Sequence, residues 1–423
     1  MDYRPRIVDP ELDGLLAGVP ALAIHGARGV GKTETAQRRA VTQFRLDDPR
    51  VRAIAEADPA RLTRGPHPTL IDEWQRLPES WDIVRRAVDD DRTPGRFLLT
   101  GSTSPAHPPT HSGAGRIVSL RMRPMSLAER GIATPTVSLA DLLSGHRGPI
   151  AGTSDVTLDQ YAHEIVRSGF PGLRDLEERG LRAELDGYLD HIVDRDFEAS
   201  GHPVRNVAAL RRWMQAYAAV VSATTSFEKI RDAATAGHAD KPAKTTVMRY
   251  ADVLEGMWIL DPVPAWHPGN SALTRLTLAP KHHLADPALA ARLLRATVQT
   301  LLAGIAPGPG GHPHATLYGA LFESLVTLNV RVFAQALDAG VYHFRDRGGA
   351  HEIDLIVEGP GLSVVAIETK LAATIGDHDV RHLAWLQQQL GGRLVDAAIV
   401  TTGRDAYRRR DGIAVIPAAL LGP

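Results

Sequence analysis

The sequence predicts an α/β protein in which a three-layer N-terminal core, a helical middle region and a second α/β domain follow one another. Three observations lead to this prediction. The stretch Gly26–Thr33 matches the glycine-rich pattern G-x-x-x-x-G-K-[ST], and it lies between an apolar run and a helix-forming run. Further apolar runs that end in polar residues follow in the N-terminal third. In the last quarter of the chain, short alternating runs carry a second set of acidic and lysine side chains.

Composition sets the outer limits of the interpretation. A chain of 423 residues with 43% hydrophobic and 23% charged residues predicts two to four ordinary globular domains. The absence of cysteine excludes disulfides, thiolate zinc sites and cysteine nucleophiles. A net charge of −1 excludes a global basic field, so nucleic-acid binding would need a local patch. We find no apolar signal sequence and no uninterrupted membrane-spanning run, and therefore expect a cytoplasmic protein without membrane contact.

The glycine-rich stretch predicts a phosphate-binding P-loop. The run Val19–Ile24 is expected to form the strand that enters it, and Glu34–Ala40 the helix that leaves it. Glycines let consecutive N–H groups point at phosphates, and the helix N-terminus adds positive potential. Lys32 would reach the β- and γ-phosphates, and the Thr33 hydroxyl would bind Mg²⁺. An ordinary glycine-rich turn does not account for Lys-Thr at the helix start. The expected binding residues are Gly26, Ala27, Arg28, Gly29, Val30, Gly31, Lys32 and Thr33.

A second motif of nucleotide-hydrolysing proteins follows at the end of the apolar run Pro68–Glu73. Asp72 would hold Mg²⁺ directly or through water, and Glu73 would activate the attacking water as general base. The Asp-Glu order favours nucleotide hydrolysis over phosphoryl transfer to a small substrate. The alternative is a strand end with two solvated acids, which is disfavoured beside a P-loop.

The run Arg96–Ser102 predicts a strand that places hydroxyl groups at the carboxyl edge of the sheet, where open α/β sheets bind ligands. Thr100 or Ser102 would contact the γ-phosphate or the attacking water, and simple turn chemistry is an equal alternative. The run Gly115–Leu120 predicts a fifth strand. Arg116 at its start either completes a neighbouring nucleotide site or forms a salt bridge, and we favour the salt bridge.

These motifs together resemble the AAA-family ATPases typical of bacteria and archaea. The order GARGVGKT, LIDEWQRLP, RFLLTGS, GRI and PMSLAER carries the resemblance, which continues through SGFPGL, DRD, TTVMRYADVLE and LFESLV and so covers most of the chain. It implies ATP as the nucleotide, and an ATPase core followed by a helical and winged-helix region and a C-terminal domain of uncertain role. The long polar insert Ala106–Ala114 departs from the family pattern.

From Leu158 onwards, apolar residues at three- and four-residue steps predict helices, which we expect to form the lid of the ATPase. A helix is expected over Leu181–Phe197. The charged run Asp194–Asp196 either reports the nucleotide state or forms a solvated turn, and we favour the turn.

Three helical segments between Val207 and Trp266, followed by a short extended stretch, resemble a winged-helix domain. The residues that would contact DNA phosphates and bases are Lys241, Lys244, Thr245, Thr246 and Arg249. Packing of this domain against the ATPase or a partner is the favoured alternative. His282-His283 and His312-x-His314 lack partners at metal-ligand spacing, so we expect surface histidines, and Ala306–Pro313 is the clearest linker.

Two apolar strands that form a hairpin are expected over Glu352–Val357 and Val364–Lys370. Period-two alternation places Glu368 and Lys370 on one face of the second strand, and hairpin pairing would bring Asp354 beside them. This pattern is similar to the D…(D/E)-x-K signature of restriction-endonuclease-like nucleases, which implies an α/β domain of that type at the C-terminal end of the sequence.

The chemistry of this set is that of metal-dependent phosphate cleavage. Asp354 and Glu368 would hold a second divalent metal, Lys370 would orient or activate water, and Glu323 from an apolar helix would be a further ligand or base. A solvated charged hairpin is the alternative, but the strongly apolar flanks favour a specific site. Because related domains keep such acids while acting in binding alone, nuclease activity stays open.

We expect five segments: an AAA-type P-loop ATPase core (1–135), a helical lid (136–205), a winged-helix domain (206–270), a linker region (271–315) and a restriction-endonuclease-like domain (316–423). The leading hypothesis is a Mg²⁺-dependent ATPase whose nucleotide state controls a DNA-acting C-terminal domain, with nuclease activity of that domain left open. The alternative is a slow ATP-gated module that binds DNA or protein through an inactive nuclease-like domain. A second copy of the chain or another protein is a further candidate partner. A P-loop kinase is disfavoured, because it leaves Glu73 and the C-terminal half without a role.

Overall fold

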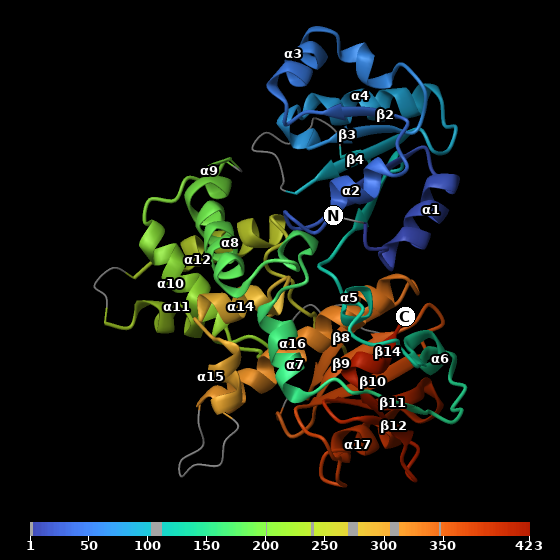
Figure 1. Cartoon of the computed structure of the whole chain (residues 1–423), viewed down its shortest axis with the longest axis vertical. Helices are drawn as coiled ribbons and strands as arrows, with labels where there is room; N and C mark the ends of the chain where they lie inside the picture. Colours follow the sequence, from blue (N-terminus) through green and yellow to red (C-terminus); the bar gives the residue numbers. More distant parts are fainter. Residues whose placement is uncertain are drawn as a thin grey trace.

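The computed structural model describes residues 3–102, 112–199, 201–237, 241–269, 278–304, 313–346 and 348–423, without the side chains of residues 199 and 313–316. Most of the insert Ala106–Ala114 and of the linker Ala306–Pro313 lies outside these residues, as does His312. Figure 1 shows three groups of elements: the N-terminal sheet with its helices, the helices of the middle region, and the C-terminal sheet.

The N-terminal group is a parallel sheet between helices. Its elements are α1 (Val8–Gly18), β1 (Ala21–His25), α2 (Lys32–Gln37), β2 (Thr42–Arg45), α3 (Pro49–Ala57), β3 (Thr69–Asp72), α4 (Glu79–Asp90), β4 (Phe97–Gly101) and β5 (Ile117–Arg121). The five strands are all parallel, in the order β2-β3-β4-β1-β5. The P-loop strand β1 therefore lies in the interior of the sheet, and the strands that carry Asp72 and Thr100 end at the same edge as β1.

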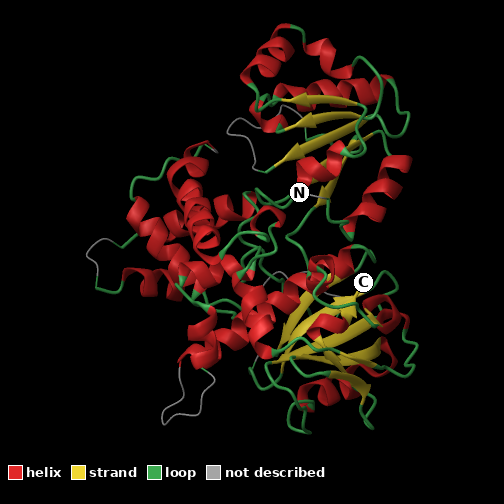
Figure 2. Ribbon diagram, in the orientation of Figure 1, coloured by secondary structure: helices red, strands yellow, loops and turns green. Residues whose placement is uncertain are grey.

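Alternate residues of β1 pack on opposite faces of this sheet, which produces the three layers expected from the sequence. Ala23 belongs to an apolar cluster with Trp81 of α4, whereas Ile24 belongs to another cluster with Leu12 of α1. Both faces are thus covered by helices (Figure 2), as parallel sheets require.

The middle region is helical, as its periodicity predicts. It comprises α7 (Leu158–Val166), α8 (Glu178–His191), a π-helix (Ile192–Asp196), α9 (Phe197–Ala199), α10 (Val207–Ala218), α11 (Phe227–Thr235), α12 (Lys244–Gly256), α14 (Pro287–Leu293) and α15 (Val298–Ala303). Helices α14 and α15 fall within the range 271–315 that was expected to be a linker. Because α14 is buried against α7, α8, α10 and α16, the described part of that range belongs to the packed interior.

The C-terminal group consists of a mixed sheet and the helices that pack against it. It contains α16 (Pro313–Gln335), β8 (Gly340–Arg345), β9 (Glu352–Glu358), β10 (Val364–Lys370), α17 (Arg381–Leu390), β11 (Leu394–Thr401), β12 (Asp405–Arg408), β13 (Ala414–Pro417) and β14 (Leu421–Gly422). The seven-stranded sheet has the order β7-β12-β13-β11-β10-β9-β8. Strands β9 and β10 are antiparallel neighbours with Ile367 opposite Leu355, so the predicted hairpin is present.

A segment that follows the N-terminal group in the sequence, residues 137–153, completes this C-terminal group. Strand β6 (Val137–Ser138) pairs with β14, β7 (Gly152–Thr153) pairs with β12, and α6 (Leu139–Ser144) packs against β10 and β11. In Figure 1 the teal α6 accordingly lies beside the red strands. The range 136–205, expected to form the lid, therefore begins with a segment that is part of the C-terminal fold.

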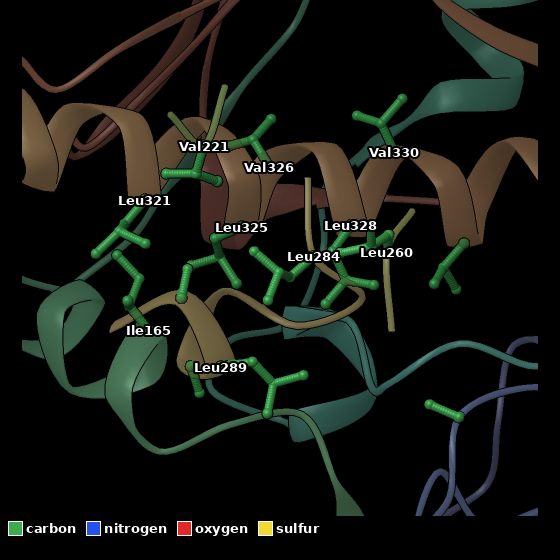
Figure 3. Close-up of a cluster of buried hydrophobic side chains, with 14 of the residues drawn as sticks. Ile165, Val221, Leu260, Leu284, Leu289, Leu321, Leu325, Val326, Leu328 and Val330 are labelled. Carbon is green, nitrogen blue, oxygen red and sulfur yellow. The ribbon is translucent and has the colours of Figure 1, made fainter. Parts of the chain in front are cut away.

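Helix α16 is the core helix that joins the middle and C-terminal groups. Figure 3 shows Leu325 and Leu328 of α16 facing Leu284 and Leu260 from the extended segments that precede it, and Leu321 pointing toward Ile165 of α7. Within the described residues, one helical stretch, Leu317–Gln335 of α16, has a length and composition that would suit a membrane span, and 67% of its most apolar window is buried inside the protein. Its apolar surface is thus used for packing within the fold.

Candidate nucleotide site and carboxylate cluster

The P-loop connects β1 to α2, and its backbone requires glycine at two positions. Gly31 has φ 101°, in the left-handed region that other residues rarely adopt. A Cβ atom on Gly26 would lie 2.1 Å from the carbonyl oxygen of Met122, so a side chain there would collide with the backbone after β5. The loop is therefore closely packed against the neighbouring strand connection, and the N-terminus of α2 points into a cavity of about 1000 Å³.

Lys32 lies at the floor of this cavity. Its Nζ atom donates hydrogen bonds to the carbonyl oxygens of Gly26 (2.8 Å) and Ala27 (2.9 Å). Burial lowers the pKa of Lys32 to about 8, with Glu73 and Asp72 acting in the opposite direction. The ammonium is therefore still predominantly charged at pH 7, and it is positioned inside the loop that would surround phosphates.

The residues expected to bind Mg²⁺ are in contact. Thr33 Oγ1 donates to Asp72 Oδ1 at 2.7 Å, and the Thr100 hydroxyl donates to the same carboxylate oxygen. Asp72 is buried. Hydroxyl and carboxylate oxygens are ligands that Mg²⁺ prefers, so the donor set fits this ion. Ser102, just beyond β4, has a buried hydroxyl that finds no hydrogen-bond partner among the described residues.

Glu73 lies beside Lys32 on the wall of the same cavity. It adopts φ 54° and ψ 46°, a left-handed conformation that is uncommon for a non-glycine residue and is frequent at functional sites. Burial raises the pKa of Glu73, and the charge of Lys32 partly offsets this rise. Gln75 Nε2 donates to Glu73 Oε2 at 2.6 Å. A partly desolvated carboxylate held in this way is suited to accept a proton from water.

Arg6 supports the loop from outside and was not predicted. Its guanidinium donates to Val30 O (2.7 Å), to Arg123 O (2.7 Å) and to Glu129 Oε1 (2.9 Å). Glu129 belongs to the PMSLAER motif, where it also closes a capping box with Ser126. No sequence pattern links Glu129 to Arg6, because the two residues lie 123 positions apart in the chain.

The helical region also reaches the P-loop. Arg28 forms an ion pair with Asp196 of the π-helix (Nη1–Oδ1 3.4 Å), and the Tyr188 hydroxyl donates to Arg28 O at 3.1 Å. The expectation of a solvated turn is thus wrong for Asp196, which lies within a continuous helix. Arg116 pairs with Asp89 (2.8 Å), which confirms the salt-bridge interpretation of that arginine.

In the C-terminal domain, the predicted hairpin brings Asp354, Glu368 and Lys370 together. Asp354 Oδ2 accepts hydrogen bonds from the backbone N–H (2.9 Å) and the hydroxyl (3.0 Å) of Thr369. Lys370 Nζ lies 3.4 Å from Glu368 Oε2, on one face of β10 as the alternation predicts. Glu323 of α16 joins this group through a shared partner, described next.

Lys281 is that partner, and no sequence pattern indicates it. Its Nζ atom lies 2.8 Å from Glu323 Oε1, 3.0 Å from Asp354 Oδ1 and 3.4 Å from Glu352 Oε1. Burial raises the pKa of Glu323 to about 8, with Asp354 adding to the rise. Burial and Asp354 likewise raise the pKa of Glu368, whose Oε1 atom is buried without a hydrogen-bond partner in the described structure.

Other predicted candidates have structural partners. Lys241, just before the candidate recognition helix, pairs with Asp232 (2.8 Å), and Lys244, at the start of that helix, pairs with Glu228 (2.8 Å), so both lysines form ion pairs with acids of α11. The expectation of surface histidines is wrong for His282 and His283, which are both buried. His282 Nε2 lies 2.6 Å from Thr225 O. The His314 side chain lies outside the described residues.

The segment that begins at Trp258 contacts both the N-terminal sheet and the C-terminal domain. Trp258 stacks on His25, the last residue of β1, and the Arg121 guanidinium lies 4.6 Å from the Trp258 ring centroid. Buried Asp261 forms ion pairs with Arg121 (3.0 Å), the last residue of β5, and with Arg123 (3.1 Å) just beyond that strand. Asp261 also pairs with Arg331 of α16 (2.8 Å), so the segment connects the ATPase sheet to the C-terminal domain.

The sheet, the P-loop and the acids of β3 define the N-terminal part as an AAA-type P-loop ATPase domain. Residues 19–130 match the family described as an AAA domain. Residues 158–300 and 318–421 match two further families, each described as a domain of unknown function (DUF8612 and DUF4143). The match of the N-terminal residues agrees with the resemblance read from the motifs.

Two mycobacterial proteins are similar to this chain over most of its length. The uncharacterized proteins Mb2031c of Mycobacterium bovis and Rv2008c of Mycobacterium tuberculosis are each 25% identical over 409 residues, covering 94% of this chain and 80% of the relative. Among solved structures, a Walker-type ATPase (PabY2304) of Pyrococcus abyssi is 11% identical, with a TM-score of 0.32 and coverage of 69% of this chain and 99% of that one. The ORC2 protein of Aeropyrum pernix, in ADPNP–ADP complexes, is 14% identical, with a TM-score of 0.29 and coverage of 71% and 97%.

Proposed function

We propose that the chain binds Mg·ATP at the P-loop and hydrolyses it, and that the nucleotide state controls the C-terminal domain. Lys32 and the loop N–H groups bind the β- and γ-phosphates, and Thr33 and Asp72 hold the metal. A Mg²⁺ ion there supplies neutralisation of the charge that develops on the phosphates. Glu73 accepts the proton of the attacking water, and Thr100 and Ser102 orient that water or the γ-phosphate.

The observation that carries the proposed control is the segment around Trp258. It contacts the base of the P-loop through His25, and it pairs through Val263 with Lys281, which lies in the carboxylate cluster. Packed and ion-paired contacts therefore connect the P-loop continuously to the carboxylate cluster, and a change at the loop can act along them. Such contacts carry coupling when they have two arrangements of different nucleotide affinity.

For the C-terminal domain we propose a nucleic-acid-binding function, with DNA as the ligand. Positive and aromatic groups support this choice. Arg381 donates to the rings of His378 (2.9 Å) and His382 (3.0 Å) near Lys370, and His351 stacks on Trp385 of α17 at 3.9 Å between ring centroids. Cationic groups bind phosphates, and an aromatic face can receive a base.

Metal-dependent cleavage of DNA is the second candidate. The convergence of Asp354, Glu368 and Lys370 on two paired strands favours it. The ammonium of Lys281 among the same carboxylates opposes it, because it supplies the positive charge that a metal would provide. We therefore propose an ATP-gated binding module that does not cleave DNA in the arrangement seen here.

The test combines phosphate release with DNA binding. The full chain should release phosphate from Mg·ATP, and Glu73→Gln should slow the release by about 10²–10⁴-fold while keeping ATP bound. With that variant, DNA affinity should differ by about 5-fold or more between ATP and ADP. Equal DNA affinity with ATP and with ADP would contradict the proposed control by nucleotide state. Absence of phosphate release would contradict the proposed ATP hydrolysis.

A further inference from the structure

The carboxylate cluster of the C-terminal domain, formed by Glu323, Glu352, Asp354 and Glu368, contains an internal cation. The Lys281 side chain is 1% exposed and points its ammonium at Glu323, Glu352 and Asp354. A buried ammonium is tolerated when carboxylates compensate its charge. Burial alone would lower the pKa of Lys281, but the neighbouring acids, and the Asp354 carboxylate above all, outweigh this effect and raise the pKa above its ordinary value. The group is therefore a permanent cation at physiological pH.

The cluster has the chemistry of a divalent-metal site, but its central positions are taken. Asp354 Oδ1 accepts from Lys281 and Oδ2 accepts from Thr369, so both oxygens already have donors. Hard divalent ions bind carboxylate oxygens at about 2.0–2.6 Å. An ion between Glu323 and Asp354 would therefore meet the ammonium at close range and be repelled by it. Among the described residues, no group of three or more His, Asp or Glu is arranged to hold a metal.

Lys281 comes from outside the C-terminal sheet. It is held in an antiparallel bridge with Val263, in which each N–H donates to the other's carbonyl at 2.9 Å. The next residues are anchored in the helical region, because His282 N donates to Ala223 O (2.9 Å) and its ring packs on Tyr217. The position of the cation is thus set by the helical region and by the segment that contacts the P-loop.

We propose that Lys281 is the resident cation of this cluster and excludes divalent metal from it while the segment that carries Lys281 stays paired with Val263. The C-terminal site is autoinhibited in this arrangement, and metal can enter when that segment withdraws. Withdrawal would leave four carboxyl groups around an empty centre with Lys370 at its edge. The inference goes beyond the proposed ATP hydrolysis and does not depend on it, because it concerns metal binding to the nucleotide-free chain.

The experiment counts Mn²⁺ bound to the nucleotide-free full chain by electron paramagnetic resonance. An Asp72→Asn background keeps the P-loop from contributing. Lys281→Met removes the cation and Lys281→Arg keeps it, and each is measured with and without Asp354→Asn. We expect Lys281→Met to bind one Mn²⁺ ion at a site whose Mn²⁺ affinity in the parent is at least about tenfold lower. Lys281→Arg should match the parent, and Asp354→Asn should abolish the gain.

Two results would overturn the inference. One is Mn²⁺ binding by the parent chain that Asp354→Asn removes, because the site would then take a metal with Lys281 present. The other is a folded Lys281→Met chain that gains no Mn²⁺. If circular dichroism shows that Lys281→Met does not fold, Lys281→Gln, which keeps a hydrogen-bond donor without the charge, replaces it under the same criteria.

Discussion

The indole ring of Trp258 stacks on the imidazole ring of His25, with ring centroids 6.0 Å apart and planes inclined by 29°. His25 directly precedes Gly26, the first residue of the P-loop. Trp258 begins the segment that contains Asp261 and pairs with Lys281. The base of the nucleotide site is therefore in direct contact with the segment that places a cation in the carboxylate cluster.

This contact should be visible in tryptophan fluorescence. Binding of Mg·ATP should change the emission of the chain, because rearrangement of the P-loop alters the surroundings of the Trp258 indole. Trp258→Phe keeps an aromatic ring against His25 and should remove most of the change. Trp385→Phe, on α17 against His351, is the matched control and should leave the change intact. Loss of the signal in the control and its retention in Trp258→Phe would contradict the assignment.

Two substitutions at the nucleotide site should separate binding from hydrolysis. Lys32→Ala removes the ammonium that reaches the phosphates and should abolish ATP binding in a calorimetric titration. Glu73→Gln keeps the shape of the side chain but removes the proton acceptor, so turnover should fall by about 10²–10⁴-fold with ATP affinity retained. A Glu73→Gln chain with undiminished phosphate release would show that another group activates the water.

Asp261 should be among the most sensitive positions for stability. Asp261→Asn leaves Arg121, Arg123 and Arg331 around a neutral side chain in the interior, and the loss of a buried partner costs about 3–5 kcal/mol. Asp155→Asn removes one partner of an exposed pair with Arg404 and should cost less than about 1 kcal/mol. Urea unfolding of the two variants and the parent measures both. Equal, small effects would mean that Asp261 is not a structural junction.

The carboxylate cluster should make stability depend on pH. Glu323 keeps its proton up to about pH 8 in the folded chain, whereas the unfolded chain releases it near pH 4.5. Between these values the unfolded state binds fewer protons, so this residue's contribution to stability falls as pH rises, by at most about 1.4 kcal/mol per pH unit. Unfolding of the parent and of Glu323→Gln between pH 5 and 8 should show the parent's advantage shrinking with pH. A constant difference would contradict the raised pKa.

The convergence of the P-loop with Asp72 and Thr100 could be predicted because it depends on local geometry. Strand ends of a parallel sheet meet at one edge, so the motifs that carry Thr33, Asp72 and Thr100 had to converge there once β1, β3 and β4 were recognised. The hairpin that joins Asp354 to Glu368 follows in the same way from alternation and a short turn. In each case, chain neighbours and strand periodicity determine the contact.

Lys281 and the segment 137–153 could not be predicted by the same reasoning. The run Lys281-His282-His283 has the composition of a surface stretch, and its burial is decided by acids on α16 and β9 that lie far away in the sequence. Strands β6 and β7 have two residues each, too short for a periodic pattern. Their partners β14 and β12 are among the last strands of the chain. Because the paired strands lie so far apart in the sequence, only the tertiary fold reveals the pairing.

Hydrogen–deuterium exchange tests the central claim, that the nucleotide state at the P-loop reaches the carboxylate cluster through the Trp258–Lys281 contacts. The Glu73→Gln chain, which holds ATP unhydrolysed, is compared in Mg·ATP and Mg·ADP, with Lys32→Ala as the control that binds neither. We predict that exchange in residues 258–269 and 278–284 differs by about 5-fold or more between the two nucleotides, and not in the control. Identical exchange of these residues with ATP and ADP, in a chain whose P-loop is protected by both, would contradict the account.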